Sequence, residues 1–382
     1  MADLEQLLSG KEIALVCGSG GVGKTTTAAA LGLMMAVHTP TRVLVVTVDP
    51  ARRLATALGL NAIGNAETPI EPRTFRQAGA ESQGELWVAM LDTKQGWDEL
   101  IRRHAPTPKV REAILANVVY QSLSERFTQS HDYLAAERLY ELHSSGRYDL
   151  IVVDTPPSRH ALDLLSAPAN MAEFFGSRLL RWLTMPSRSR VLTMASKPFY
   201  QIADRILGTQ FLGDLVEFFS LLQTMESGFV ERAHAVEALF EDRRTTFVVV
   251  STLEASPVAE ARFFINELVA DHFHLGGLIL NKVLPPEFAQ AEIGKVAATL
   301  RRRSGELAEQ VEGDNVGLAS AVFNAMADNA LNMQAAARRE QELCAELTVA
   351  AEVTVMVPYL DGDITDFASL IGFGSNLLGL TR

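Results

Sequence analysis

Gly18-Ser19-Gly20-Gly21-Val22-Gly23-Lys24-Thr25 lies near the start of this chain and restricts its architecture more than any other segment. It matches the pattern G-x-x-x-x-G-K-[ST]. An apolar run, Ile13 to Cys17, precedes it, and an Ala- and Leu-rich run from Thr26 to about Val37 follows it. A strand, a glycine-rich loop and a helix in this order surround an anion with backbone N–H groups and the positive end of a helix dipole. The alternative is a glycine turn that only packs a strand on a helix, and the complete pattern makes phosphate binding the better interpretation.

The side chains of this loop indicate which ligand it holds. A lysine at the position of Lys24 reaches the β- and γ-phosphates of a nucleotide, and the hydroxyl of Thr25 is placed for Mg²⁺. We therefore predict that the chain binds ATP and Mg²⁺. The expected phosphate contacts come from Gly18, Ser19, Gly20, Gly21, Val22, Gly23, Lys24, Thr25 and Thr26.

Composition excludes several classes of protein. Of the 382 residues, 48% are hydrophobic and 21% charged, which is ordinary for a globular protein. The net charge of −12 argues against a nucleic-acid surface and against constitutive binding to anionic lipids. No uninterrupted apolar run is long enough to span a membrane, and the N-terminus lacks the apolar core of a signal peptide, so we expect a cytoplasmic protein. The two cysteines, Cys17 and Cys344, cannot form a Cys₄ zinc site, and we interpret both as packing residues.

Short Val-, Ile- and Leu-rich runs recur along the chain with helical periodicity between them. Several are apolar throughout, which is typical of parallel strands buried on both faces. We therefore predict an α/β fold, a doubly wound and mostly parallel sheet, with one P-loop domain formed by residues 1–165 and 241–382 and a helical subdomain inserted at 166–240. Residues 61–85 are polar and are expected to form a loop, and the three arginines at 301–303 are expected on a solvated helix face. The expected strands are Ile13–Cys17, Val43–Val48, Leu86–Asp92, Leu150–Asp154, Phe247–Ser251, Leu275–Asn281 and Val353–Val357.

The insertion carries more apolar residues than one face of a surface helix requires. A long helix is expected from about Phe211, with one stripe at residues 211, 215, 218, 222, 225 and 229, and part of a second at 212, 216, 219 and 230. Two stripes indicate either a helix packed inside the protein or one that buries its second face against a partner. The sequence leaves these alternatives open.

Two of the expected strands end in a carboxylate. Asp49 follows Val43–Val48, and Asp154 closes Leu150–Asp154. The carboxyl ends of parallel strands form the edge at which open α/β sheets bind ligands. An acidic residue that closes an apolar strand well after a P-loop is the usual Mg²⁺-site carboxylate. Each aspartate taken alone could instead cap a helix.

Together these segments resemble the ArsA-type ATPases, a family that includes arsenite-pump ATPases and the guided-entry ATPase for tail-anchored membrane proteins. The likeness covers essentially the whole chain. The family's P-loop ends in GGVGKTT, its switch I reads D-P-A-h-x-L, and its switch II reads D-T-x-P-x-x-H-x-L-x-L-L. The corresponding segments here are Gly20 to Thr26, Asp49 to Leu54 and Asp154 to Leu165, and Asn281-Lys282 and Val357-Pro358 are similar to the family's adenine-contacting elements.

The resemblance implies a nucleotide-driven dimer with a helical subdomain that binds an apolar helix or a membrane-protein client, peripheral at the membrane through a partner. It implies catalytic roles for Lys24 and Asp49, the latter positioning the attacking water. Asp154 would hold the Mg²⁺ shell, through water, together with Thr25. Asn281 and Pro358 would contact adenine.

Three departures from the family pattern matter. Ser19 occupies the position of the family's signature lysine, which contacts nucleotide phosphates across the dimer. The chain also lacks the cysteines that bind As(III) in arsenite-activated members and the CxxC zinc site of the eukaryotic guided-entry member. We therefore expect neither metalloid-stimulated transport nor a zinc-clamped dimer. Arg159, or the pair Arg52 and Arg53, could replace part of the lysine's work, because a guanidinium suits phosphate oxygens; surface ion pairs are the alternative.

Three functions remain open at this point. The first is an ATPase that works as a homodimer and binds an apolar client. The second is a weakly hydrolysing subunit that pairs with a lysine-bearing paralogue in a heterodimer. The third is a positioning ATPase of the partitioning type, which the charge of −12 and the lack of a basic C-terminal helix disfavour.

Overall fold

An eight-stranded sheet forms the centre of the protein, in the order β3-β4-β2-β5-β1-β6-β7-β8. The structure is a computed structural model, and it describes residues 3–48, 53–60, 63–91, 96–124, 131–177, 209–311, 315–347, 351–360 and 362–380. The strands are β1 (Ile13–Gly18), β2 (Arg42–Thr47), β3 (Thr68–Pro69), β4 (Glu85–Met90), β5 (Leu150–Asp154), β6 (Thr245–Ser251), β7 (Leu275–Val283) and β8 (Val353–Pro358).

The sheet confirms the predicted α/β fold. All strand pairs are parallel except β3 with β4. The expected strands are all present, and every residue of β1, β5 and β6 is buried, which explains why these runs are apolar throughout. The expectation for residues 61–85 was incomplete. This segment contains the short strand β3 and α4 (Pro72–Gln77), which is fixed by the buried ring of Phe75 lying edge-on to Phe367 at 5.2 Å.

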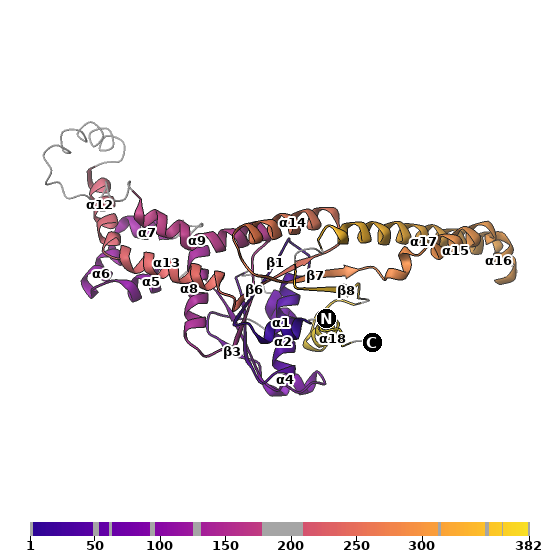
Figure 1. The fold of residues 1–382 in the computed structure, drawn as a ribbon, viewed down its shortest axis with the longest axis horizontal. Helices are drawn as coiled ribbons and strands as arrows, with labels where there is room; N and C mark the ends of the chain where they lie inside the picture. The colour runs from indigo at the N-terminus through magenta and orange to yellow at the C-terminus, as the bar shows by residue number, and fades with distance from the viewer. Residues whose placement is uncertain are drawn as a thin grey trace.

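Helices cover both faces of the sheet (Figure 1). Alternate residues of β1 enter two separate cores: Ala14 and Val16 face one, and Ile13, Leu15 and Cys17 face the other. The first core includes residues of α1 (Leu4–Ser9), α2 (Lys24–His38), α3 (Arg53–Ala57), α4 and α18 (Phe367–Leu377). The second includes residues of α8 (His131–Ser144), α9 (Ser158–Gly176), α13 (Glu226–Glu241) and α14 (Ala255–Ala270).

A third core lies in a helical layer at one end of the molecule (Figure 1). The distal parts of α8, α9 and α13 meet there with α5 (Gly96–His104), α6 (Pro108–Ala116), α7 (Val118–Ser124) and α12 (Thr209–Gln223). Residues 96–124 contribute to this core although they precede the expected insertion at 166–240. We therefore propose that the helical unit also includes residues 96–124. Residues 178–208 of the insertion lie outside the described part of the chain.

The long helix expected from about Phe211 is in fact two helices, because α12 ends at Gln223 and α13 begins at Glu226. Phe218, Leu222 and Phe229 are buried in the helical core. The described residues of the first apolar stripe are therefore packed inside the protein. Of the second stripe, Phe219 is half-buried against the same core. The side chains of Phe211 and Leu212 are outside the described residues.

An arm projects from the opposite end of the sheet (Figure 1). It connects β7 to β8 and consists of η2 (Pro286–Ala289), α15 (Ala291–Arg302), α16 (Ser304–Val311) and α17 (Val316–Ala345). Arg301, Arg302 and Arg303 are exposed there, as predicted. Across the described ranges of the chain, no helix has the length and apolarity needed to cross a membrane.

Candidate nucleotide site

Glycine is required at both ends of the loop between β1 and α2. Gly18 leaves β1 with a backbone φ of 154°, and a Cβ at this position would collide with the carbonyl oxygen of Val250 on β6. Gly23 has a φ of 101° and immediately precedes α2, where a Cβ would collide with the side-chain amide of Asn281. The left-handed conformation and the close neighbours together exclude any other residue without rearrangement.

The first turn of α2 is open toward the loop. No side chain caps the helix at Gly23, so the first backbone N–H groups have no partner from a cap residue. Val22 is buried and anchors the loop against the first sheet core. A helix N-terminus at the edge of a glycine loop attracts an anion through its N–H groups and its dipole. This geometry suits the phosphate chain of a nucleotide.

Lys24 closes the loop with its own side chain. Its buried ammonium Nζ donates a hydrogen bond to the carbonyl oxygen of Ser19 at 2.8 Å, across five residues. The hydroxyl of Ser19 is also buried, and among the described residues it has no hydrogen-bond partner. The residue at the signature-lysine position therefore supplies its backbone to the loop and no cation.

A cavity of about 450 Å³ opens directly beside the loop. This volume lies within the range of about 300–1,000 Å³ that is usual for small-molecule sites. Its walls come from the P-loop, from α3 and from the segment before α18. The lining residues are Gly21, Gly23, Lys24, Thr25, Thr26, Thr56, Ala57 and Ile364.

Asp154 ends β5 between the two strands that carry the other site segments. It pairs in register with Val16 of β1 and with Thr47 of β2. The carboxylate is fully buried, and its Oδ2 accepts a hydrogen bond from the hydroxyl of Thr47 at 2.9 Å. Thr47 was missed by the sequence reasoning. The signal that could have identified it is a hydroxyl residue near the end of the strand before switch I.

The backbone after Asp154 is fixed to β1. Thr155 donates two hydrogen bonds to the carbonyl oxygen of Val16, one from its hydroxyl at 2.9 Å and one from its N–H at 3.3 Å. Helix α9 then begins at Ser158, which places Arg159 in its first turn. The side chain of Arg159 lies outside the described residues. So do residues 49–52 and the side chain of Arg53. The roles expected for Asp49, Arg52, Arg53 and Arg159 therefore stay predictions.

Asn281 braces the P-loop from β7. Its buried side-chain Nδ2 donates a hydrogen bond to the carbonyl oxygen of Val22 at 2.8 Å, and its Oδ1 accepts one from the N–H of Lys282 at 2.9 Å. The expected contact of Asn281 with adenine stays a prediction. The sequence analysis did not predict its contact with the P-loop. Pro358 ends β8 and is exposed, and the N–H of the next residue, Tyr359, donates to the carbonyl oxygen of Val283 at 3.0 Å.

The donor groups at this edge fit a nucleotide with Mg²⁺. Thr25, in the first turn of α2, offers a hydroxyl, and Asp154 offers a buried carboxylate. Both are the hard oxygen ligands that Mg²⁺ prefers. Cys17, which precedes the loop, is not a competing ligand, because burial raises the pKa of its thiol to about 12.

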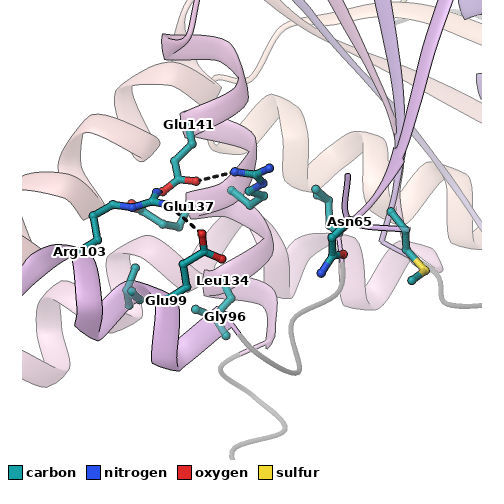
Figure 2. Close-up of a pocket in the computed structure, with 11 residues that line it drawn as sticks. Asn65, Gly96, Glu99, Arg103, Leu134, Glu137 and Glu141 are labelled. Carbon is teal, nitrogen blue, oxygen red and sulfur yellow. Dashed lines mark hydrogen bonds and ion pairs between the residues drawn. The ribbon is translucent and has the colours of Figure 1, made fainter. Parts of the chain in front are cut away.

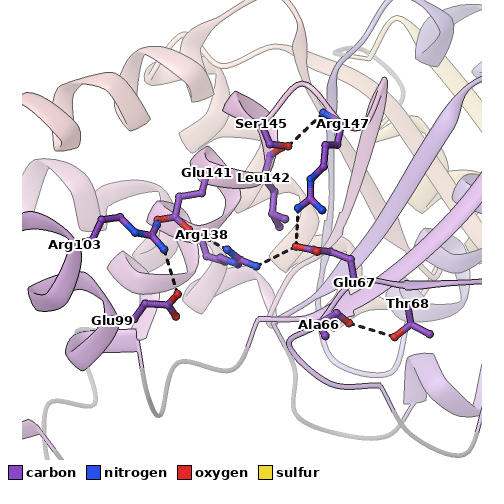
Figure 3. A network of polar contacts seen from close by, with 10 residues as sticks. All are labelled: Ala66, Glu67, Thr68, Glu99, Arg103, Arg138, Glu141, Leu142, Ser145 and Arg147. Carbon is purple, nitrogen blue, oxygen red and sulfur yellow. Dashed lines mark hydrogen bonds and ion pairs between the residues drawn. The ribbon is translucent and has the colours of Figure 1, made fainter.

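A second, smaller cavity of about 80 Å³ lies between α5, α8 and the end of β4 (Figure 2). Four of its five charged lining residues pair with one another, and the fifth, Glu137, contacts Arg232 at 2.9 Å instead. Arg103 contacts Glu99 and Glu141, and Arg138 contacts Glu141. Figure 3 shows how this network continues to the sheet edge, where Glu67 lies 3.0 Å from Arg138 and 3.1 Å from Arg147. We interpret this cavity as part of the contact region between the helical layer and the sheet.

Comparison with known proteins agrees with this site. The family model described as Anion-transporting ATPase (ArsA_ATPase) matches residues 11–312, which is most of the chain. The chain belongs to this family. It is thus an ATP-hydrolysing enzyme, and the ArsA-type resemblance seen in the sequence is confirmed.

Individual relatives are distant in sequence. An ATPase ASNA1 homolog of Entamoeba dispar is 24% identical over 288 residues, which cover 74% of this chain and 80% of the relative. The ATPase GET3 of Komagataella phaffii is 22% identical and covers 70% of this chain and 72% of its own length. An arsenical pump-driving ATPase of Acidiphilium multivorum is 26% identical over 76% of this chain, but only 42% of the relative is covered.

Proposed function

We propose that this chain is a Mg²⁺-dependent ATPase that works as a dimer and couples ATP binding and hydrolysis to the binding and release of an apolar membrane-protein segment. Relatives named ATPase GET3 and ATPase ASNA1 homolog support a function of this kind. The activity would take place in the cytoplasm, and the protein would reach the membrane only through a partner.

One helix carries the proposed coupling. Helix α9 begins four residues after Asp154 and runs for 19 residues, about 28 Å at 1.5 Å per residue. Its first part packs in the second sheet core through Ala161 and Leu164, and its last part packs in the helical core through Phe175. Since both ends are held in packed cores, a displacement of the segment after Asp154 would reach the helical layer.

The proposed client surface lies at the distal end of α9. Phe174 is exposed there, and the centre of its ring is 6.4 Å from that of Phe219. The buried Phe218 stripe is used for internal packing, so we assign client contact to the face around Phe174. An adaptable aromatic surface suits apolar helices of varied sequence.

A substitution at Phe174 tests the client surface. Phe174→Asp should weaken cross-linking to an apolar helical peptide while basal ATP turnover stays unchanged, because the side chain is exposed and distant in sequence from the P-loop. Glu173→Gln, at the exposed neighbouring position, is the matched control. Equal cross-linking by both variants and the unchanged protein would exclude this face as the client site.

Lys24→Ala tests the assigned nucleotide site. The substitution removes the cation that would meet the β/γ-phosphates and the hydrogen bond that closes the loop onto Ser19. ATP binding, measured by calorimetry, and ATP turnover should both be lost. Normal turnover in this variant would place the active site elsewhere.

The buried Ser19 favours a second candidate function, a subunit that hydrolyses little ATP alone and pairs with a lysine-bearing paralogue. The described part of the P-loop offers one cation, Lys24. The test is to compare the ATP turnover of the purified chain with its turnover after mixing with a paralogue. A large increase in the mixture would favour the heterodimer, and equal turnover would favour the homodimer.

A further inference from the structure

The end of β7 departs from regular strand geometry. Leu280 pairs with Met356 of β8. The next pair is Val283 with Pro358, so β7 has one residue more than β8 between the two pairs. Within this bulge, Lys282 has a backbone φ of 59°, in the left-handed region that residues other than glycine rarely adopt. A bulge next to a binding site directs a side chain, and a strained backbone persists only where the surrounding structure holds it.

The residue before Lys282 connects the bulge to the P-loop. Asn281 lies on the same face of β7 as Ile279, which is part of the first sheet core together with residues of α2. The Nδ2 of Asn281 donates a hydrogen bond to the carbonyl oxygen of Val22 at 2.8 Å, and its Oδ1 accepts one from the N–H of Lys282 at 2.9 Å. The position of this amide therefore depends on the backbone of the bulge.

Two hydrogen bonds hold the chain directly after the bulge. The N–H of Tyr359, beyond the end of β8, donates to the carbonyl oxygen of Val283 at 3.0 Å. The N–H of Leu284 donates to Oε2 of Glu340 at 2.9 Å. Glu340 belongs to α17, which runs from the far end of the arm back to the sheet (Figure 1). A carboxylate of the arm thus contacts the backbone three residues after Asn281.

Other side chains attach α17 to the connecting segment farther from the bulge. Arg338 donates a hydrogen bond from Nε to the carbonyl oxygen of Ala289 at 3.3 Å. The buried Gln334 donates from Nε2 to the carbonyl oxygen of Gln290. Both contacts remain when Glu340 is replaced, so the loss of its carboxylate should release the backbone beside the bulge without detaching the arm.

We propose that Glu340 is a positioning residue for nucleotide binding, which holds the backbone after the bulge and thereby fixes the amide of Asn281 against the P-loop. Glu340 itself does not touch the nucleotide. A displacement of α17 would change the affinity of the chain for nucleotide, because the same hydrogen bond connects the arm to the site. The proposal rests on the nucleotide site assigned to Lys24 and requires neither the dimer nor the client.

Calorimetry of the full chain with Mg²⁺ and the β,γ-imido analogue of ATP tests the proposal. Glu340→Ala should weaken binding by about three- to tenfold, the range expected for one lost hydrogen bond. Burial raises the pKa of Glu340, so an uncharged amide suits its surroundings, and Glu340→Gln should bind like the unchanged protein because its oxygen still accepts from Leu284. Glu342→Ala is the matched control, since Glu342 is exposed and lies about 160° around α17 from Glu340.

A double-mutant cycle tests whether Glu340 acts through Asn281. Asn281→Ala removes the amide that contacts Val22 and should weaken binding of the ATP analogue. Because Glu340 is proposed to act only through that amide, Glu340→Ala should cause little further loss in the Asn281→Ala background. A carboxylate that merely stabilised the arm would instead cause the same loss in both backgrounds.

Several results would overturn the proposal. Unchanged affinity in Glu340→Ala, equal weakening by Glu340→Ala and Glu342→Ala, or multiplying losses in the double variant would each reject a positioning role. Glu340→Asp keeps the charge on a side chain one methylene shorter, so it should weaken binding even if Glu340→Ala does not fold; normal affinity in a folded Glu340→Asp would count against the proposal. Normal binding by Lys24→Ala would reject the nucleotide site itself, whereas loss of binding in Lys24→Ala alone would reject only the role of Glu340.

Discussion

The hydroxyl of Thr47 donates a hydrogen bond to Oδ2 of Asp154 at 2.9 Å, and this contact joins the ends of β2 and β5 at the nucleotide edge of the sheet. The chain continues from Thr47 into the switch I segment and from Asp154 into switch II. Both side chains are buried, so a low local dielectric strengthens the bond. The contact therefore fixes the orientation of the carboxylate that we assign to the Mg²⁺ shell.

Thr47→Val should weaken Mg²⁺-dependent hydrolysis and leave the fold intact. Valine keeps the branched shape that a buried strand prefers, but it cannot donate to Asp154. Loss of such a supporting hydrogen bond typically costs about 10–100-fold in metal affinity or activity. The measurement is ATP turnover as a function of Mg²⁺ concentration. Thr47→Ser retains the hydroxyl and should behave like the unchanged protein; an equal defect in both variants would contradict a role for the hydrogen bond.

Phe175→Ala should destabilise the helical layer far more than Phe174→Ala. The ring of Phe175 is buried and stacks on Phe229 with centroids 4.7 Å apart, whereas Phe174 is exposed. Truncation of a buried Phe to Ala costs about 3–5 kcal/mol, and an exposed substitution usually changes stability by less than about 0.5 kcal/mol. Urea denaturation followed by circular dichroism measures both effects. Similar midpoints for the two variants would show that this core contributes little to stability.

The strands could be predicted because they are buried on both faces, so that hydrophobicity alone identifies them. β5 matches its predicted bounds, and the loop before α2 follows from its glycines. The helical layer was harder to predict from the sequence, because its core combines residues distant in sequence, such as Ile114 and Phe229. No local pattern shows which of two apolar stripes meets a neighbouring helix. The break at Thr224 and Met225 also carries no glycine or proline that could have indicated it.

Those parts of the candidate site could be predicted for which a local sequence motif specifies both the residue type and the backbone conformation. The loop, Lys24 and Asp154 belong to this group. The contacts of Thr47 and Asn281 depend on which strands are neighbours in the sheet. No local sequence pattern predicts the order of the strands. Asn281 reaches Val22 only because β7 lies beside β6, which in turn pairs with β1.

Asp242→Asn should lower the free energy of unfolding at neutral pH. The variant should also lose less of this free energy than the unchanged protein when the pH is lowered. Hydrogen bonds from the side chain and backbone N–H of Arg244 lower the pKa of Asp242 from 3.8 to about 2. Because the native pKa is depressed, this contribution is present above pH 3.8 and is lost as the pH falls toward about 2. The pair is partly exposed, so the effect should stay below about 1 kcal/mol. Urea denaturation of both proteins across this pH range measures it, and parallel pH curves would contradict the assignment.

Ser19→Lys should increase ATP hydrolysis if the missing cation limits the rate. Negative charge spreads over the γ-phosphoryl oxygens in the transition state. A second cation at these oxygens can increase the rate of hydrolysis by about 10³–10⁵-fold. The Ser19 hydroxyl is buried and cannot supply that charge. We propose that Arg159, in the first turn of α9, supplies part of it, in which case Arg159→Ala should slow turnover and Ser19→Lys should restore activity to that variant. Arg302→Ala, on an exposed helix of the arm, is the control for loss of an arginine. Unchanged turnover in Arg159→Ala, together with strong activation by Ser19→Lys or by a paralogue, would exclude the arginine and favour the heterodimer.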